Sequence, residues 1–132
     1  MAGRAAAHRA AFGSSRVTTE RHARLRETWP YRPALDLIVA SPDGEAAAYC
    51  QGSYDEVHGT GESEPVGTRP EHRRQGLARA VRIAVLHGFA EAGGRHATVH
   101  CRGDSAYPGP RRLYASMGFT AYGRTHTYVR TA

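Results

Sequence analysis

The chain has 132 residues, which is enough for one domain with one core and too few for two. Its formal net charge is +6, and all 18 basic residues are arginines, because the sequence contains no lysine. This composition excludes P-loop nucleotide hydrolases and Schiff-base enzymes, since both need a lysine amine. No apolar run is long enough for a membrane span or a secretory signal, so we expect a cytoplasmic protein with no membrane partner.

The two cysteines, Cys50 and Cys101, both fall in runs that are typical of strands. In a cytoplasmic protein we expect them to be reduced core residues. Neither lies at metal-ligand spacing from any of the eight histidines, so the sequence predicts no metal site.

The first half of the chain predicts two helices followed by three strands. Ala5–Phe12 has high helix propensity and ends at a Gly-Ser-Ser break. A second helix begins with cap-type residues at Thr18 and runs to about Trp29, where two nearby prolines end it. The runs that follow are separated by turn signals and predict strands over residues 34–40, 46–54 and 62–68.

The second half predicts a long amphipathic helix, because apolar residues recur along one stripe. The stripe consists of Leu77, Val81, Val85 and Phe89 at every fourth position, with Ala84 and Gly88 beside them. Gly93 and Gly94 are a natural end for this helix. Beyond it we expect a strand over residues 96–101, a helix around residues 113–117, and a closing hairpin of residues 120–122 and 127–129.

The connection between the third strand and the long helix reads Arg-Arg-Gln-Gly-Leu-Ala over residues 73–78. A tight turn that opens a helix presents unpaired backbone N–H groups and the positive end of the helix dipole, which together favour a phosphate or pyrophosphate. Arg73 and Arg74 add two permanent positive charges. Taken alone, this glycine turn would equally suit an ordinary crossover connection that binds nothing.

Two sequence blocks make the chain resemble the GNAT superfamily of acyl-CoA-dependent N-acetyltransferases. The family's pyrophosphate loop has Arg or Gln, two residues, Gly, one residue, and then Gly or Ala; Arg73, Gly76 and Ala78 fill those places. Downstream, residues 112–119 resemble the family's Leu-Tyr-x-x-x-Gly-Phe signature, at the spacing that the family shows. The resemblance is strongest over residues 62–130 and weaker over residues 1–61.

This resemblance implies a single GNAT-like domain over residues 1–132, of the α/β (α+β) class. Its central sheet would be mixed and mostly antiparallel, with helices on both faces. The family usually begins with a strand before the first helix, and none is apparent here. Either the chain is truncated at this point or the sheet is one edge strand short.

The resemblance also implies acetyl-CoA as co-substrate and an amine as acceptor. The pantetheine arm would lie against the main chain of Val66, Gly67 and Thr68, where a glycine allows close approach. The pyrophosphate would be held by the backbone of the loop residues Arg73, Arg74, Gln75, Gly76, Leu77 and Ala78. Family members often dimerise through their last strands, which allows a homodimer here without deciding it.

Tyr114, in the second block, is the candidate general acid for the leaving thiolate, because the family places this phenol near the thioester sulfur. A phenol with an ordinary pKa of ~10 is protonated at neutral pH and can donate. The competing interpretation is a core tyrosine on an amphipathic helix beside Leu113 and Met117. Residues around the expected acid depart from the family in one respect, since Tyr107 stands where many members carry an Asn that contacts the cofactor.

Glu62 and Glu64 are the candidates for the base that deprotonates the amine. Residues two apart in a strand share a face, so both carboxylates should project the same way as Val66 and Thr68. Two neighbouring carboxylates can raise one pKa toward neutrality. The alternative is a pair that keeps the strand soluble or forms ion pairs with nearby arginines.

Three functions remain open from the sequence. The first is an active N-acetyltransferase for a small amine, a peptide N-terminus or a protein lysine. The second is an inactive GNAT-fold protein that binds acyl-CoA without turnover. The third is a basic nucleic-acid-binding domain, which we disfavour because the arginines are scattered and no recognition motif appears.

Overall fold

The computed structural model describes residues 2–13 and 16–131. Its contacts group the chain into two compact units, one ending at Val99 and the other beginning at His100. In chain order the elements are α1 (Ala2–Phe12), α2 (Thr19–Leu25), β1 (Tyr31–Ala40), β2 (Ala46–Asp55), β3 (Thr60–Thr68), the 3₁₀ turn η1 (Pro70–His72), α3 (Leu77–Glu91), β4 (His96–Thr98) and α4 (Gly109–Ser116).

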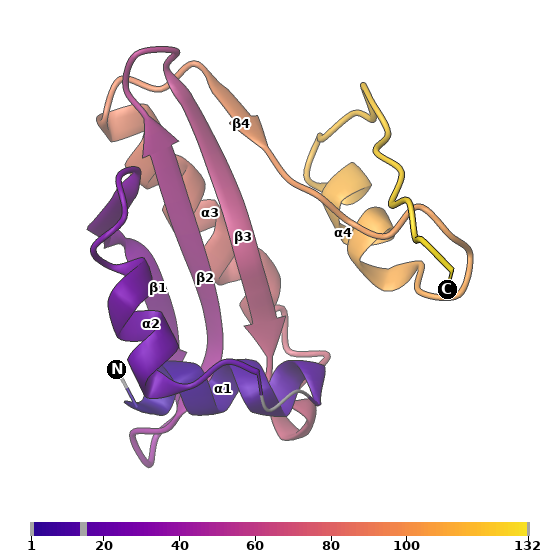
Figure 1. Cartoon of the computed structure of the whole chain (residues 1–132). Helices are drawn as coiled ribbons and strands as arrows, with labels where there is room; N and C mark the ends of the chain where they lie inside the picture. Colours follow the sequence, from indigo (N-terminus) through magenta and orange to yellow (C-terminus); the bar gives the residue numbers. More distant parts are fainter. Residues whose placement is uncertain (1, 14–15, 132) are drawn as a thin grey trace. The chain divides into compact units, whose positions relative to one another are not determined.

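The first unit is built on a four-stranded sheet in the order β1-β2-β3-β4 (Figure 1). The pairs β1–β2 and β2–β3 are antiparallel, and β3–β4 is parallel. The parallel pair is made by a crossover through α3, as the sequence predicts for a strand, helix, strand unit. The predicted fold class is confirmed: the sheet is mixed and mostly antiparallel, and helices cover both of its faces.

The main core lies between the sheet and α3, where Val81, Val85 and Phe89 of the predicted stripe are buried. The ring of Phe89 lies so close to two sheet glycines that an added Cβ would come within 2.8 Å of it at Gly52 and within 2.4 Å at Gly61. These glycines therefore let α3 approach the sheet closely. Ala84 is exposed and does not belong to the stripe, because the apolar face of the helix is narrower than predicted.

The opposite face of the sheet is covered by α1 and is smaller. Ala7 and Ala11 of α1 pack against Ala46 and Tyr49 of β2. Gly67 at the end of β3 belongs to this layer, since a Cβ there would lie 2.8 Å from the Tyr49 hydroxyl and 2.9 Å from the Ala11 methyl group. The small side chains of Ala7, Ala11 and Ala46, and the absence of one at Gly67, thus let α1 pack against Tyr49 and the sheet.

Several predicted boundaries are wrong, each for a local reason. α2 begins as expected, with the Thr18 hydroxyl accepting from the Arg21 N–H at 3.1 Å, but it ends at Leu25 because the next residues bond three positions back in successive turns. β4 ends at Thr98 instead of extending to residue 101, and Cys101 is exposed instead of buried. Cys50 is buried as predicted.

The closing hairpin is not formed, because residues 119–131 contain no strand. Their alternating aromatic and β-branched side chains gave the strand signal, yet Tyr122, Tyr128 and Val129 are largely exposed. A strand pattern needs a neighbouring strand to pair with, and a sequence pattern alone does not supply it. In the described part of the chain the first element is α1, with no strand ahead of it.

Gly61→Ala should destabilise the protein by about 1–3 kcal/mol, because the new methyl group overlaps the Phe89 ring in a tightly packed layer. Thermal unfolding followed by circular dichroism measures the effect. Gly109→Ala is the matched control, since a Cβ there meets nothing within 4 Å. A Gly61→Ala variant that unfolds at the same temperature as the wild type would show that α3 does not pack against β3 as described.

Candidate functional site

The connection from β3 to α3 is anchored by Arg69. Its backbone N–H donates to the Ala47 carbonyl and its Nε to the Ala46 carbonyl, each at 2.9 Å. Its Nη1 also lies 3.9 Å from Glu45 and 3.7 Å from Glu71. The start of the connection is therefore fixed to the beginning of β2 before the chain turns into η1.

The turn that follows has left-handed backbone at Arg74, with φ of 62°, and at Gly76, with φ of 73°. Gly76 is the N-cap of α3, and its carbonyl accepts the first helical hydrogen bond from the Ala80 N–H at 3.0 Å. The N–H groups of Leu77, Ala78 and Arg79 precede this bond and so have no i−4 acceptor within the helix. A Cβ at Gly76 would meet nothing within 4 Å, so there is free space beside the turn at this residue.

The side chains of this loop divide into two groups. Arg73, Arg74 and Gln75 are exposed, whereas Leu77 and Ala78 are half-buried. The Arg73 guanidinium donates to the Ala11 carbonyl near the end of α1 at 3.0 Å. The turn thus has the geometry of an anion site: a glycine-permitted conformation, the first N–H groups of a helix, and exposed cationic side chains.

The second part of the site is the edge of β3 that faces β4. Parallel pairing runs only from Thr60–His96 to Glu62–Thr98. From Ser63 onward, no strand in residues 2–13 and 16–131 pairs with this edge. Val66, Gly67 and Thr68 pair with β2 on their other side. The predicted pantetheine segment is therefore an open strand edge, which is where an extended ligand arm can hydrogen-bond to main chain.

A bulge interrupts β3 beside this edge. Gly52 pairs with Ser63 and Cys50 with Val66, so Glu64 and Pro65 together lie opposite Gln51. The bulge shifts the alternation of side chains, and Val66 packs into the core under α3. The predicted single face for Glu62, Glu64, Val66 and Thr68 is therefore wrong, because an extra residue interrupts the period of two.

The two candidate bases differ in burial. Glu62 is exposed and lies at the last β3–β4 pair. Glu64 is partly buried, and its Oε1 atom is fully buried. Both form interactions within the protein. Glu62 thus lies at the surface where β3 and β4 part, and Glu64 lies partly buried in the bulge that follows.

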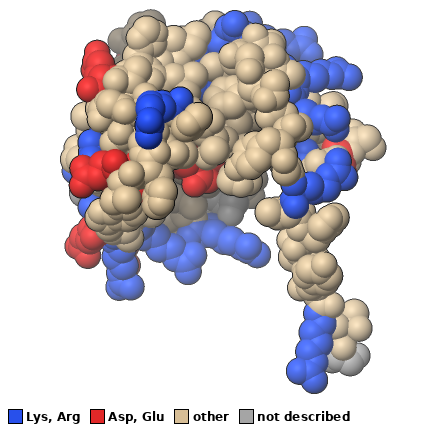
Figure 2. All heavy atoms as spheres, turned by 90° about the horizontal axis from the view of Figure 1, so that it is seen from above, with Lys and Arg blue, Asp and Glu red and all other residues tan. Residues whose placement is uncertain are grey.

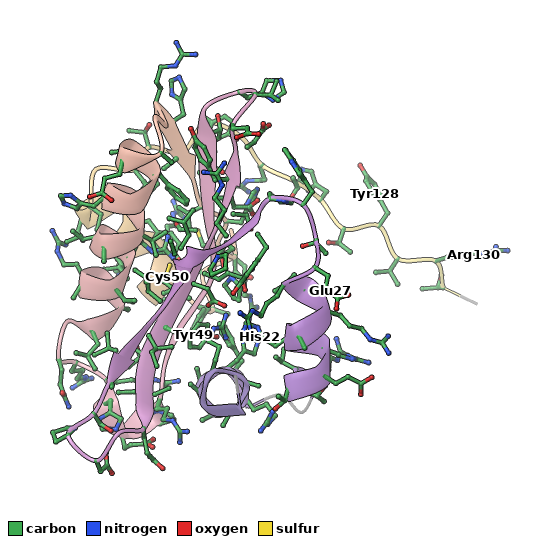
Figure 3. All side chains as sticks on the ribbon, turned by 90° about the vertical axis from the view of Figure 1, so that its left-hand side faces the viewer. His22, Glu27, Tyr49, Cys50, Tyr128 and Arg130 are labelled. Carbon is green, nitrogen blue, oxygen red and sulfur yellow. The ribbon has the colours of Figure 1, made fainter. Side chains whose placement is uncertain are left out.

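A buried polar cluster, which sequence analysis missed, ties α1 and α2 to the sheet. The Asp36 carboxylate lies 3.3 Å from Arg4 Nε and 3.2 Å from His22 Nε2, and accepts from the Tyr31 hydroxyl at 2.8 Å. Burial lowers the pKa of His22 more than the neighbouring Asp36 carboxylate raises it. The available signal was an aspartate within the apolar run Leu35–Ala40. Figure 3 shows His22 beside the sheet on this side.

Tyr49 extends this cluster toward β3. Its hydroxyl lies 2.6 Å from His8 Nδ1, and its ring lies 3.6 Å below the Arg4 guanidinium carbon. Burial raises the pKa of the Tyr49 phenol well above its usual value, so the phenol stays protonated. Burial likewise lowers the pKa of His8 to about 4, with the charge of Arg4 acting in the same direction.

Tyr114 belongs to the second unit, on α4. It is buried, and its ring meets the edge of Phe119 with centroids 6.2 Å apart. The helix ends in a left-handed Gly118, and the Phe119 N–H returns to the Tyr114 carbonyl at 3.1 Å. The Leu-Tyr-x-x-x-Gly-Phe block thus forms a helix terminus that fixes the Tyr114 backbone.

No cluster of three or more potential metal-ligating side chains occurs among the described residues. Likewise, none of the described helices is both long and apolar enough to cross a membrane. Figure 2 shows basic side chains at several separate places on the viewed face, with acidic ones on other parts of it. They do not form a single continuous stripe there.

The sequence pattern of the acetyltransferase (GNAT) family matches residues 6–119, so the chain belongs to the GNAT family of acetyltransferases. No curated protein sequence matches it. A solved structure assigned to this family from Desulfovibrio desulfuricans is 26% identical, with a TM-score of 0.62; the match covers 67% of this chain and 55% of that one. The chain thus spans about half of that relative's length.

Two further structures share the fold at lower identity. The aminoglycoside N-acetyltransferase AAC(6')-Iy, solved with the bisubstrate analogue CoA-S-monomethyl-acetylneamine, is 17% identical with a TM-score of 0.74, over 98% of this chain and 90% of that one. The ribosomal-protein-S18-alanine N-acetyltransferase of Escherichia coli is 18% identical with a TM-score of 0.72, over 92% and 72%.

The free energy of unfolding should fall as the pH drops from about 6.5 toward about 4, because the unfolded chain binds a proton at His8 that the folded protein does not. Urea unfolding at several pH values measures this slope. His8→Gln should flatten it, whereas the control His87→Gln, at an exposed position of α3, should retain it. Equal slopes in the wild type and His8→Gln would contradict a partly buried, neutral His8.

Proposed function

We propose that this protein transfers the acetyl group of acetyl-CoA to a primary amine of a small molecule or peptide, by direct attack in a ternary complex. Membership of the GNAT family supports acetyl transfer in general. The single observation that carries the cofactor assignment is the left-handed Gly76 turn, which opens α3 beside free space and follows an edge of β3 that no strand of the described residues pairs with beyond Glu62.

In this proposal the loop binds the pyrophosphate through the backbone of residues 73–78. Arg74 and its neighbours supply positive charge without any metal. The main chain of Val66, Gly67 and Thr68 holds the pantetheine arm along the open edge of β3. Gly67 is needed in any case where Tyr49 and α1 pack, so its backbone is held rigidly where the arm would lie.

Acetyl-CoA supplies an activated acyl group as a thioester. The amine nitrogen forms a bond to the acyl carbon, the carbon–sulfur bond breaks, and the electron pair leaves with the sulfur. The chain must then accept one proton from the amine and provide one hydrogen bond or proton to the thiolate. We assign the first task to Glu64 or Glu62 and the second to the phenol of Tyr114.

Between the two carboxylates, partial burial favours Glu64 as the base, because a base shielded from water is held in a defined position. Glu62 is exposed and would act through water. The acceptor is proposed only as a primary amine, since the two neighbours whose acceptors are named act on different molecules and share only the fold with this chain. A cytoplasmic location and free Cys50 and Cys101 thiols complete the proposal.

One observation favours the alternative of acyl-CoA binding without turnover. Residues 119–131 form no strand, so the sheet in the described part of the chain has four strands. A protein with an intact loop and an incomplete acceptor side would bind the cofactor and fail to transfer the acetyl group. Cofactor binding and turnover therefore have to be measured separately.

Gly76→Asp should weaken acetyl-CoA binding by at least about tenfold, or roughly 1.4 kcal/mol, because it places a negative charge against the phosphates. Isothermal titration calorimetry measures the dissociation constant. Gly76→Asn is the matched control, since it adds a side chain of the same shape at the same left-handed position without the charge. Equal binding by the wild type and Gly76→Asp would remove the pyrophosphate site from this turn.

Tyr114→Phe should lower kcat by about 100-fold or more while acetyl-CoA binding persists, because it removes the hydroxyl group that donates the proton and keeps the ring. Steady-state turnover against a panel of primary amines, with calorimetry in parallel, separates the two effects. An unchanged kcat would leave Tyr114 with a packing role. Cofactor binding by the wild type with no turnover of any amine would favour the alternative function.

A further inference from the structure

Tyr49 is a fully buried aromatic side chain on the face of the sheet that α1 covers. Its relative exposure is 0%, and it packs among the alanines of α1 and of the start of β2. Directly opposite it on β3 lies Gly67, in the segment along which the pantetheine arm is proposed to lie. A buried residue paired with this segment can therefore act on the ligand through the backbone alone.

The Tyr49 ring occupies the space that a side chain at Gly67 would fill. A Cβ added to Gly67 would lie 2.8 Å from the Tyr49 hydroxyl oxygen and 2.9 Å from the Cε1 atom of the ring. Directly opposite residues of two antiparallel strands place their side chains on the same face. Because Gly67 has no side chain, the ring of its partner extends over its backbone and covers it from the α1 side.

Contacts with α1 hold the ring in this position. The Tyr49 hydroxyl lies 2.6 Å from His8 Nδ1, and the Arg4 guanidinium carbon lies 3.6 Å from the ring centroid. Arg4 is itself fixed, since its Nε lies 3.3 Å from the Asp36 carboxylate. The ring is thus held at its hydroxyl end and on one face.

The register of β2 and β3 shows how Gly67 uses its backbone groups. The Arg69 N–H donates to the Ala47 carbonyl at 2.9 Å, so these two residues form a hydrogen-bonded pair. Hydrogen-bonded pairs recur at every second position of an antiparallel ladder, and the register continues without a shift through Tyr49 and Gly67. The Gly67 N–H and C=O groups therefore face Tyr49.

Val66 and Thr68, on either side of Gly67, have the opposite orientation. Their N–H and C=O groups point away from β2, toward the edge that no strand of residues 2–13 and 16–131 pairs with. An extended ligand arm would bond to these two residues as an added strand does. The direction of their groups is set by the Gly67 backbone between them, which the ring covers.

We propose that Tyr49 is a positioning residue for acetyl-CoA: its ring covers Gly67 and so keeps the outward N–H and C=O groups of the two flanking residues aligned with the pantetheine arm. This inference rests on the proposed function for the identity of the ligand. The packing of the ring on Gly67 is a property of the folded protein and is tested separately.

The test uses calorimetry with two probes, acetyl-CoA and 3′-phospho-ADP, which is the nucleotide half of coenzyme A and carries the pyrophosphate without the arm. Tyr49→Leu should weaken acetyl-CoA binding by about tenfold, since misaligned main-chain hydrogen bonds cost about that much, and should weaken binding of the nucleotide by less than about twofold. Tyr49→Phe, which keeps the ring, should lie between Tyr49→Leu and the wild type.

Tyr54→Leu is the matched control, because it makes the same substitution at a buried tyrosine of the same strand. The Tyr54 ring stacks with Phe89 at a centroid distance of 6.2 Å, and its hydroxyl donates to the Ala92 carbonyl at 3.1 Å, on the α3 side of the sheet. This variant should lower Tm and leave the ratio of the two affinities at the wild-type value. A ratio that changes equally in Tyr54→Leu and Tyr49→Leu reflects general loosening of the sheet and overturns the inference.

A double-mutant cycle tests the packing without any ligand. Gly67→Ala should lower Tm in the wild type, because the added methyl group overlaps the Tyr49 ring. In a Tyr49→Leu background the ring is gone, so Gly67→Ala should lower Tm by less. The Ala11 methyl group lies 2.9 Å from the added Cβ position and contributes in both backgrounds. Equal losses in the two backgrounds would show that the ring does not cover Gly67 and would overturn the inference.

Failure of this inference and failure of the proposed function give different results. Wild-type protein that binds neither probe contradicts the proposed function itself. Wild-type protein that binds both probes, together with a folded Tyr49→Leu variant that binds acetyl-CoA as tightly as the wild type, leaves the cofactor assignment standing and overturns the role of Tyr49.

Discussion

The close contact of the Phe89 ring with two glycines of the sheet is the packing on which the rest of the first unit depends. Because Gly52 and Gly61 have no side chains, α3 lies directly against β2 and β3. Val81, Val85 and Phe89 hold the helix along its length, and its N-terminal turn follows the end of β3 through η1. A bulkier residue at either glycine would push α3 away from the strand whose edge the proposed site uses.

The two faces of the sheet are covered by layers of different chemical character. Under α3 the layer is mostly apolar, with the Arg82–Ser63 hydrogen bond as a buried polar contact beside the bulge. Under α1 and α2 the layer is held by hydrogen bonds that converge on Asp36 and Tyr49. The first kind of layer tolerates little change in volume, while the second depends on protonation state, because its imidazoles are neutral only above their lowered pKa values.

Much of this fold follows from local sequence signals. The stripe on α3, the Thr18 cap and the glycine turn at Gly76 are short-range features, and each is found where predicted except that the stripe does not include Ala84. The bulge at Glu64 and Pro65 and the absence of a strand after Phe119 were missed, because both depend on which strand lies alongside. The Asp36 cluster joins residues far apart in the chain, so its partners could not be inferred from an aspartate in an apolar run.

The contact between Arg73 and the end of α1 makes the loop and the helix thermodynamically linked. The Ala11 carbonyl is one of the last acceptors of α1, and the Arg73 guanidinium satisfies it. Any anion that attracts Arg73 toward the loop must compete with this role as a helix cap. Ligand affinity at the loop and order in the last turn of α1 are therefore coupled. A change that stabilises one conformer of Arg73 alters both of them.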